Sequence, residues 1–127
     1  MANGYKDLRA WQLGMEIVGE AYALSSILPK EETWSLVDQI RRAAVSIPSN
    51  IAEGTGRGSR LDFRRYLRMA MGSVFELETQ LLIVSRLKMA SLEDVKPLLK
   101  KLDEQCKVLR GLIRSQSEQR SVTASHS

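Results

Sequence analysis

The sequence predicts an all-α fold, an antiparallel up-down-up-down four-helix bundle, from three observations. Four segments carry apolar residues at alternating spacings of three and four, the period of an amphipathic helix. Short polar links join these segments, which favours antiparallel neighbours, and no stretch alternates as a strand does. The chain has 127 residues, enough for one domain to bury a core without disulfides or metal. We expect helices at about 7–28, 33–53, 60–88 and 92–115.

The first segment has two apolar stripes. One holds Leu8, Trp11, Met15, Val18 and Tyr22, and the other holds Ala10, Leu13, Ile17, Ala21, Leu24 and Leu28. A helix that is apolar on two sides must be covered on two sides, either by its own bundle or by another subunit. Each helix of a four-helix bundle has one side facing out, so we favour an oligomer interface for one stripe. The expected interface residues are Leu13, Ile17, Ala21, Leu24 and Leu28.

The second segment contains a proline. Pro48 lacks a backbone donor and crowds the preceding turn, so we expect it to bend the helix. Ile51 continues the apolar face beyond it, so the proline is not expected to end the helix. Gly54 is expected to stop the helix, and Ser59 with Asp62 forms a capping box that opens the third segment.

Small residues indicate where the second and third helices come closest. Antiparallel pairing brings Ala44 level with Gly72, so we expect Gly72 at the closest approach of the two helices. The same alignment predicts an ion pair between Arg42 and Glu76.

The fourth segment opens with a second capping pair, Ser91 and Asp94, and carries Cys106 among its core positions. A small buried thiol is the expected role of that cysteine. The helical period stops near residue 115 and the remaining residues are polar. We therefore expect a four-helix bundle over residues 1–114 and a disordered C-terminal tail over residues 115–127.

The distribution of charged and apolar residues indicates the cellular compartment of the protein. The N-terminus has no signal pattern, and charges interrupt every apolar run before it reaches membrane-spanning length. A single cysteine cannot form an internal disulfide, which agrees with a reducing compartment. We expect a cytoplasmic protein without membrane association.

The residues required for common catalytic sites are missing. The single histidine, His126, lies in the predicted tail, which excludes a His-based triad or a His metal site within the bundle. The glycine-rich GTGRG lacks the Lys-Ser/Thr that follows in a phosphate-binding loop. Glu76 and Glu78 are two apart on a helix and point in different directions. We expect no enzymatic activity, no cofactor, no metal and no small-molecule substrate.

Arginine is concentrated in one part of the chain. Residues 41–68 carry seven arginines against two carboxylates, whereas the whole chain has a net charge of +4. Arg60, Arg64 and Arg68 recur every four residues and form a row on one side of a helix, which Arg57 extends. Such a row is either a solvated face held in salt bridges or a surface that binds phosphates. The candidate nucleic-acid contacts are Arg57, Arg60, Arg64, Arg65 and Arg68.

Two long strings resemble a known family. QIRRAAVSIPSNIAEGTGRGS, followed by FRRYLRMAMGSVFELETQL, is similar to the four-helix-bundle family named after intervening sequences in bacterial 23S rRNA genes. The N-terminal YKDLRAWQLGMEIV fits the opening of that family, and the resemblance covers about residues 5–110. The family signature falls on Arg41, Arg42, Ser46, Pro48, Ser49, Asn50, Glu53, Gly54, Gly72, Glu76 and Glu78.

The resemblance implies a ring-shaped homopentamer that is related in fold to the accessory variability proteins of diversity-generating retroelements. It also implies an association with RNA, while the molecular role of the family is largely unestablished. We therefore expect a non-enzymatic oligomer that binds nucleic acid, RNA in particular, through its basic surface. The alternative is a ring-shaped protein-protein interaction scaffold without nucleic-acid binding, which uses the polar ridge Ser46, Ser49, Asn50 and Glu53.

Overall fold

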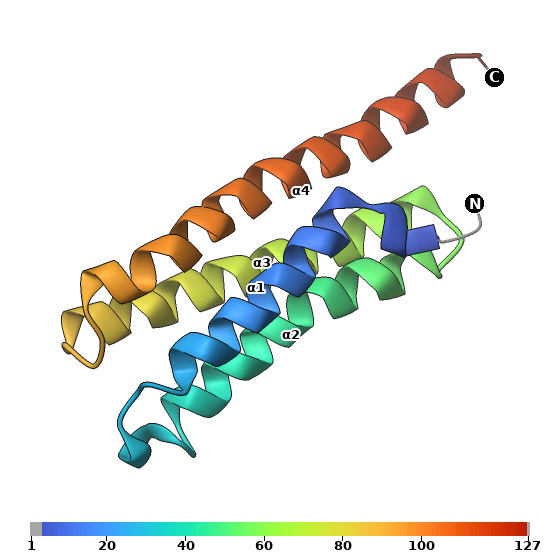
Figure 1. The fold of residues 1–127 in the computed structure, drawn as a ribbon. Helices are drawn as coiled ribbons and strands as arrows, with labels where there is room; N and C mark the ends of the chain where they lie inside the picture. The colour runs from blue at the N-terminus through green and yellow to red at the C-terminus, as the bar shows by residue number, and fades with distance from the viewer. Residues whose placement is uncertain (1–3, 127) are drawn as a thin grey trace.

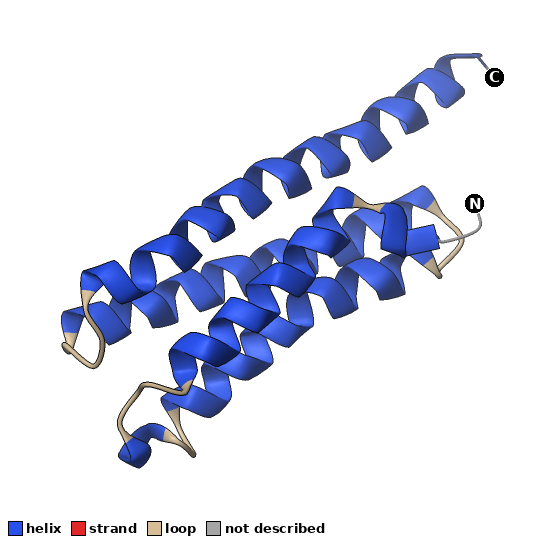
Figure 2. Ribbon diagram, viewed as in Figure 1, coloured by secondary structure: helices blue, strands red, loops and turns tan. Residues whose placement is uncertain are grey.

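The structure, a computed structural model, describes the backbone of residues 4–126 and the side chains of residues 4–117. It contains four α-helices, α1 (Arg9–Ser25), α2 (Leu36–Thr55), α3 (Arg60–Arg86) and α4 (Leu92–His126) (Figure 1). Short 3-10 turns precede the first two helices, η1 (Gly4–Asp7) and η2 (Lys30–Glu32). The described residues include no strand (Figure 2). The predicted all-α four-helix bundle is confirmed.

The helices pack in the order in which they follow along the chain. Each helix contacts the next one, and α1 closes the bundle against α4. Successive helices run in opposite directions (Figure 1). Burying a large aliphatic side chain stabilises the folded state by roughly 1.5–3 kcal/mol, so the aliphatic core is the main source of stability. The largest fully buried apolar side chains are Leu13, Ile17, Ile40, Ile47, Ile51, Leu67, Leu77, Leu81, Leu98, Leu102 and Leu109.

Both predicted capping pairs form at helix starts. The Ser59 hydroxyl oxygen accepts a hydrogen bond from the backbone N–H of Asp62 at 3.1 Å, which fixes the first turn of α3. Ser91 and Asp94 form a reciprocal pair, with bonds of 3.1 and 3.2 Å between each side chain and the other residue's backbone N–H. These caps place the starts of α3 and α4 where the sequence predicts them.

The apolar stripe that we expected at a subunit interface lies inside the chain's own bundle. Leu13, Ile17 and Ala21 are fully buried, and Leu24 and Leu28 are each only 7% exposed. This corrects the expectation that these five side chains form an exposed interface. The other stripe of α1 is the one that faces outward, with Met15 47% and Tyr22 41% exposed.

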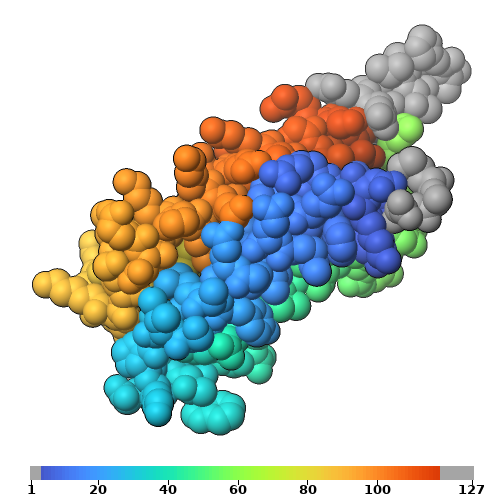
Figure 3. All heavy atoms as spheres, viewed as in Figure 1, coloured from blue at the N-terminus to red at the C-terminus, as the bar shows by residue number. Residues whose placement is uncertain are grey.

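Ion pairs join α1 to α4. Lys101 Nζ lies 2.8 Å from Glu16 Oε1 and 3.2 Å from Glu20 Oε2. Arg9 Nη2 lies 2.7 Å from Glu104 Oε2. Figure 3 shows α1 and α4 side by side along one face of the molecule. These pairs lie along the edge of α1 that contacts α4, and the stripe next to this edge packs into the core.

Pro48 lies inside α2, and the helix continues beyond it to Thr55. Ile51, one turn further on, is fully buried with the rest of the apolar face. The prediction that the proline does not end the helix is confirmed. Gly54 falls within the last turn of α2, one residue before the helix ends.

Gly72 does not lie at the closest approach of α2 and α3, so that prediction is wrong. It is exposed, and a Cβ built on it would meet nothing within 4 Å. The core side of α3 is set by residues such as Leu67, Val74 and Leu81, and Gly72 projects from the opposite side. The tight contact between these helices involves Gly54 instead.

α4 continues to His126, past the end that we predicted near residue 115. Side chains are described as far as Ser117, so the division into a 1–114 bundle and a separate 115–127 tail stays a prediction. None of the helices in the described part of the chain has a stretch long and apolar enough to cross a membrane.

Candidate nucleic-acid interface

The candidate interface begins where α2 and α3 approach closely. A Cβ on Gly54 would stand 2.7 Å from Tyr66 Cβ and 3.1 Å from Phe63 Cδ1, so a larger residue at 54 requires the helices to shift. The absence of a side chain at position 54 lets Tyr66 pack against the end of α2, where it is 9% exposed. This contact sets the position of the turn that carries the first arginine.

Arg57 is held within this turn. Its Nη2 donates to Glu53 Oε2 at 2.6 Å and to Tyr66 Oη at 2.5 Å. Its guanidinium also lies over the Tyr66 ring, 5.0 Å from the ring centroid. The hydrogen bond to Glu53 raises the pKa of Arg57 further, so the side chain stays charged and paired. Arg57 therefore stabilises the α2–α3 turn and does not extend the arginine row.

Arg65 lies on the same side of α3 as Tyr66. Its Nη2 is 3.6 Å from Asp62 Oδ1, and its guanidinium is 5.7 Å from the Tyr66 ring centroid. Arg57 and Arg65 thus flank one tyrosine, and each has a carboxylate neighbour. Their positive charge is largely compensated within the chain.

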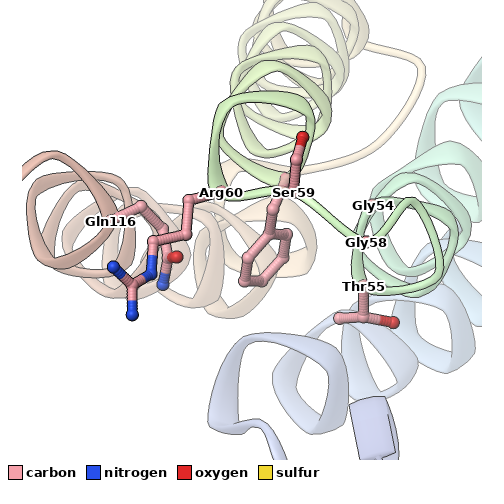
Figure 4. A pocket seen from close by; sticks show the side chains of 7 residues that line it. Gly54, Thr55, Gly58, Ser59, Arg60 and Gln116 are labelled. Carbon is pink, nitrogen blue, oxygen red and sulfur yellow. The ribbon is translucent and has the colours of Figure 1, made fainter. Parts of the chain in front are cut away.

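Arg60, Arg64 and Arg68 form the predicted row, on the side of α3 that faces α4. Arg64 Nη1 donates to Ser117 Oγ on α4 at 2.7 Å. Arg60 lines a hollow at the end of the bundle, with its side chain beside Gln116 of α4 (Figure 4). Among the side chains described, none of these three arginines has a carboxylate partner. The structure therefore separates the five candidate arginines into a paired group and an unpaired row.

α4 adds two arginines that we did not select from the sequence. The bond between Arg64 and Ser117 joins the two antiparallel helices, so Arg114 and Arg110, three and seven residues before Ser117, lie on the part of α4 that runs beside α3 beyond Arg64. Both are exposed and, within residues 4–117, have no ion-pair partner. Their spacing of four residues was a usable signal, but only the helix register places them beside α3. We call the resulting surface the α3–α4 arginine strip, which consists of Arg60, Arg64, Arg68, Arg110 and Arg114.

Several residues of the family signature have structural contacts between helices. The Ser46 hydroxyl donates to the Ala43 carbonyl and shares a second hydrogen bond with the Ser73 hydroxyl on α3, and Asn50 donates to the Ser46 carbonyl. Glu53 holds Arg57, as described above. The polar ridge is therefore used mainly inside the chain, with Ser49 left exposed.

The signature arginines of α2 also lie outside the strip. Arg41 Nε donates to Ser25 Oγ at 2.8 Å, and its guanidinium stands 4.7 Å from the centroid of the Tyr22 ring. Arg42 pairs with Asp38, one turn earlier, at 3.0 Å. The predicted pair between Arg42 and Glu76 is wrong, because the local carboxylate on α2 holds Arg42. Of the two signature glutamates, Glu76 is exposed and Glu78 is half-buried.

The described residues offer few groups for metal or nucleophilic chemistry. They contain no cluster of three or more His, Cys, Asp or Glu side chains that could hold a metal ion. Cys106 is buried, as predicted, and burial raises the pKa of its thiol, which disfavours the reactive thiolate.

The fold and the strip together define a four-helix bundle with a row of arginines along two adjacent helices. Residues 6–111 match the family model described as 23S rRNA-intervening sequence protein. The chain belongs to this family. No curated protein matches the chain.

A solved structure shares this fold. It is a crystal structure of a protein with unknown function from the S23 ribosomal protein family of Bacteroides thetaiotaomicron. The two chains are 26% identical and superpose with a TM-score of 0.76, over 82% of this chain and 97% of the other. The similarity therefore extends over nearly the whole of that protein.

Proposed function

We propose that this protein is a non-enzymatic, homo-oligomeric bundle that binds nucleic acid, RNA in particular, along the α3–α4 arginine strip. The observation that carries the proposal is the lack of carboxylate partners for the strip among the side chains of residues 4–117. Unpaired guanidinium groups in rows attract phosphates, and each contact releases counterions. The family description and the name of the structural neighbour both refer to ribosomal components, which supports RNA as the nucleic acid.

A salt titration tests this function. Binding of fluorescein-labelled RNA is followed by fluorescence anisotropy at 50 and 200 mM salt. Five phosphate contacts predict that affinity falls roughly 100- to 500-fold between these concentrations. Binding that is absent, or that does not change with salt, overturns the proposal.

A matched pair of variants locates the binding surface. The triple variant Arg60→Gln, Arg64→Gln and Arg68→Gln is expected to weaken RNA binding strongly and to flatten the salt dependence. Arg86→Gln is the control, because Arg86 is exposed on the same helix but about 27 Å from Arg68 along the axis. The triple variant removes three charges and the control removes one, so losses of binding free energy in the ratio of three to one would show that only net charge matters.

The homo-oligomer is supported by an apolar outer face on α1 and α2. This face surrounds a hollow between the two helices and is formed by Tyr5, Trp11, Met15, Val18, Val45, Pro48 and Ala52. Contiguous apolar surface of this kind is unusual on monomers. We propose that a second copy of the chain covers it. The subunit number, five, is carried over from the family resemblance.

The scaffold alternative has less support. Ser46, Asn50 and Glu53 make their hydrogen bonds within the chain, so little of the polar ridge is free for a partner protein. The same titration separates the two functions, because a protein scaffold has no salt-dependent affinity for RNA.

A further inference from the structure

Phe75 lies at the inner end of the α3–α4 arginine strip. It is seven residues beyond Arg68 on α3, and seven residues make almost two full turns, so both side chains project from the same side of the helix. Phe75 is 44% exposed. A single exposed apolar residue is ordinary on a protein surface. Phe75 differs from such a residue because it lies in line with the arginines of α3.

The helix register brings Phe75 close to the arginines of α4 as well. Arg64 contacts Ser117, and eleven residues further along each antiparallel helix bring Phe75 to within about one turn of the level of Cys106. Arg110 follows Cys106 by one turn on the same side of α4. Burial raises the pKa of the Cys106 thiol, the charge of Arg110 opposes this shift, and Glu78 adds to it. Arg110 and Glu78 therefore both lie near this level of the bundle.

The strip ends at Phe75. Glu78, less than one turn beyond it on α3, is a carboxylate that repels phosphates, whereas Asp103 on α4 is paired with Lys107, with Oδ2 and Nζ 3.5 Å apart. A bound strand that follows the arginines from Arg60 thus stops beside the aromatic ring. The ring lies at the position where the row of arginines, and with it the phosphate contacts, ends.

A row of cations next to an aromatic face is the arrangement that binds single-stranded nucleic acid. Successive arginines on one helix face stand about 6 Å apart, because four residues rise about 1.5 Å each. Phosphates contact the cations, while an unpaired base can stack on the ring. The bases of a duplex are already stacked and paired, so they cannot use the ring.

We propose that Phe75 stacks on an unpaired base of a single-stranded RNA whose phosphates lie along the α3–α4 arginine strip. This inference rests on the proposed function and adds to it the class of RNA and the residue that selects it.

The test compares two substitutions at Phe75 with a control substitution elsewhere on α3. Phe75→Leu removes the ring but keeps an apolar side chain, and it is expected to weaken binding of a fluorescein-labelled uridine 20-mer about 5-fold or more. Phe75→Trp is expected to retain or increase the affinity, because it restores a stacking face. Leu82→Ala is the control, since Leu82 is exposed on α3 about two turns beyond the strip. Circular dichroism melts confirm that all three variants are folded.

The outcome with a 20-base-pair RNA duplex completes the test. The wild type is expected to bind the single strand more tightly than the duplex, and Phe75→Leu is expected to reduce that difference. If the arginine variants lose binding while Phe75→Leu does not, or if the duplex binds more tightly, this inference is overturned and the proposed function stands. If the wild type binds neither RNA, both are overturned.

Discussion

Gly14 on α1 lies directly against Pro48 on α2. A Cβ on Gly14 would stand 3.3 Å from Pro48 Cβ and 3.4 Å from both Pro48 Cδ and Pro48 N. The rigid Pro48 ring therefore packs against a glycine, which has no side chain that would collide with it. The contact draws α1 and α2 together beneath their apolar outer face.

A large side chain at position 14 is expected to force these helices apart. Gly14→Leu should lower the free energy of unfolding by about 1–3 kcal/mol, the usual cost of overpacking. Gly19→Leu is the matched control on the same helix, because a Cβ there meets nothing within 4 Å. Urea unfolding followed by circular dichroism measures both variants, and equal stabilities would contradict the assigned contact.

Two glycines are expected to respond in opposite ways to alanine. Gly54→Ala should destabilise the fold, because the new Cβ lies 2.7 Å from Tyr66 Cβ and one of the helices must move. Gly72→Ala should stabilise it by up to about 1 kcal/mol, since alanine is the better helix former and the site is open. Thermal melts of the two variants against wild type give the sign of each effect. A loss of stability in Gly72→Ala would show that the site is crowded.

The outer face of α1 and α2 is expected to control assembly. Met15→Glu places a charge in this face and should shift the mass measured by light scattering toward one subunit. Leu87→Glu is the control, because Leu87 is equally apolar and exposed but lies after α3, away from this face. A wild-type mass of one subunit would remove the oligomer proposal, whereas a dimer or tetramer would remove only the number five.

The ion pairs between α1 and α4 are expected to make stability depend on pH. The hydrogen bond from Lys101 lowers the pKa of Glu16, and Arg9 adds to this effect. A carboxylate with a lowered pKa stabilises the fold above its ordinary pKa of 4.5, and this contribution is lost as the pH falls through the lowered value. The stability difference between wild type and Glu16→Gln should therefore be largest near pH 7 and should vanish in acid. Urea unfolding at pH 7, 5 and 3 measures it, with Glu31→Gln as an exposed control.

The helices themselves could be predicted from the sequence because apolar spacing and caps are local signals. Ser59 and Ser91 cap α3 and α4 as expected. Which stripe of α1 faces the core could not be predicted in this way, since both stripes have helical spacing. The choice depends on how α1 packs against α2 and α4, and its contacts with α4 include Glu16 with Lys101, which are 85 positions apart.

The candidate site was only partly predictable for a similar reason. The row Arg60, Arg64 and Arg68 follows from spacing on one helix. Its extension by Arg114 depends on the register between two helices, which no local pattern specifies. Arg57 was predicted to extend the row because it precedes Arg60 in the chain. Its hydrogen bonds to Glu53 and Tyr66 hold it at the α2–α3 turn instead.

The closure of α1 on α4 is the longest-range step in forming the bundle. The contacts between α1 and α2, α2 and α3, and α3 and α4 join helices that are neighbours in the chain, so these hairpins need only short loops to close. The contact between Arg9 and Glu104 spans 95 residues and carries the largest entropy of closure. On the ribosome, the side of α1 that packs against α4 therefore stays uncovered until α4 has left the exit tunnel, although α2 already covers the neighbouring side.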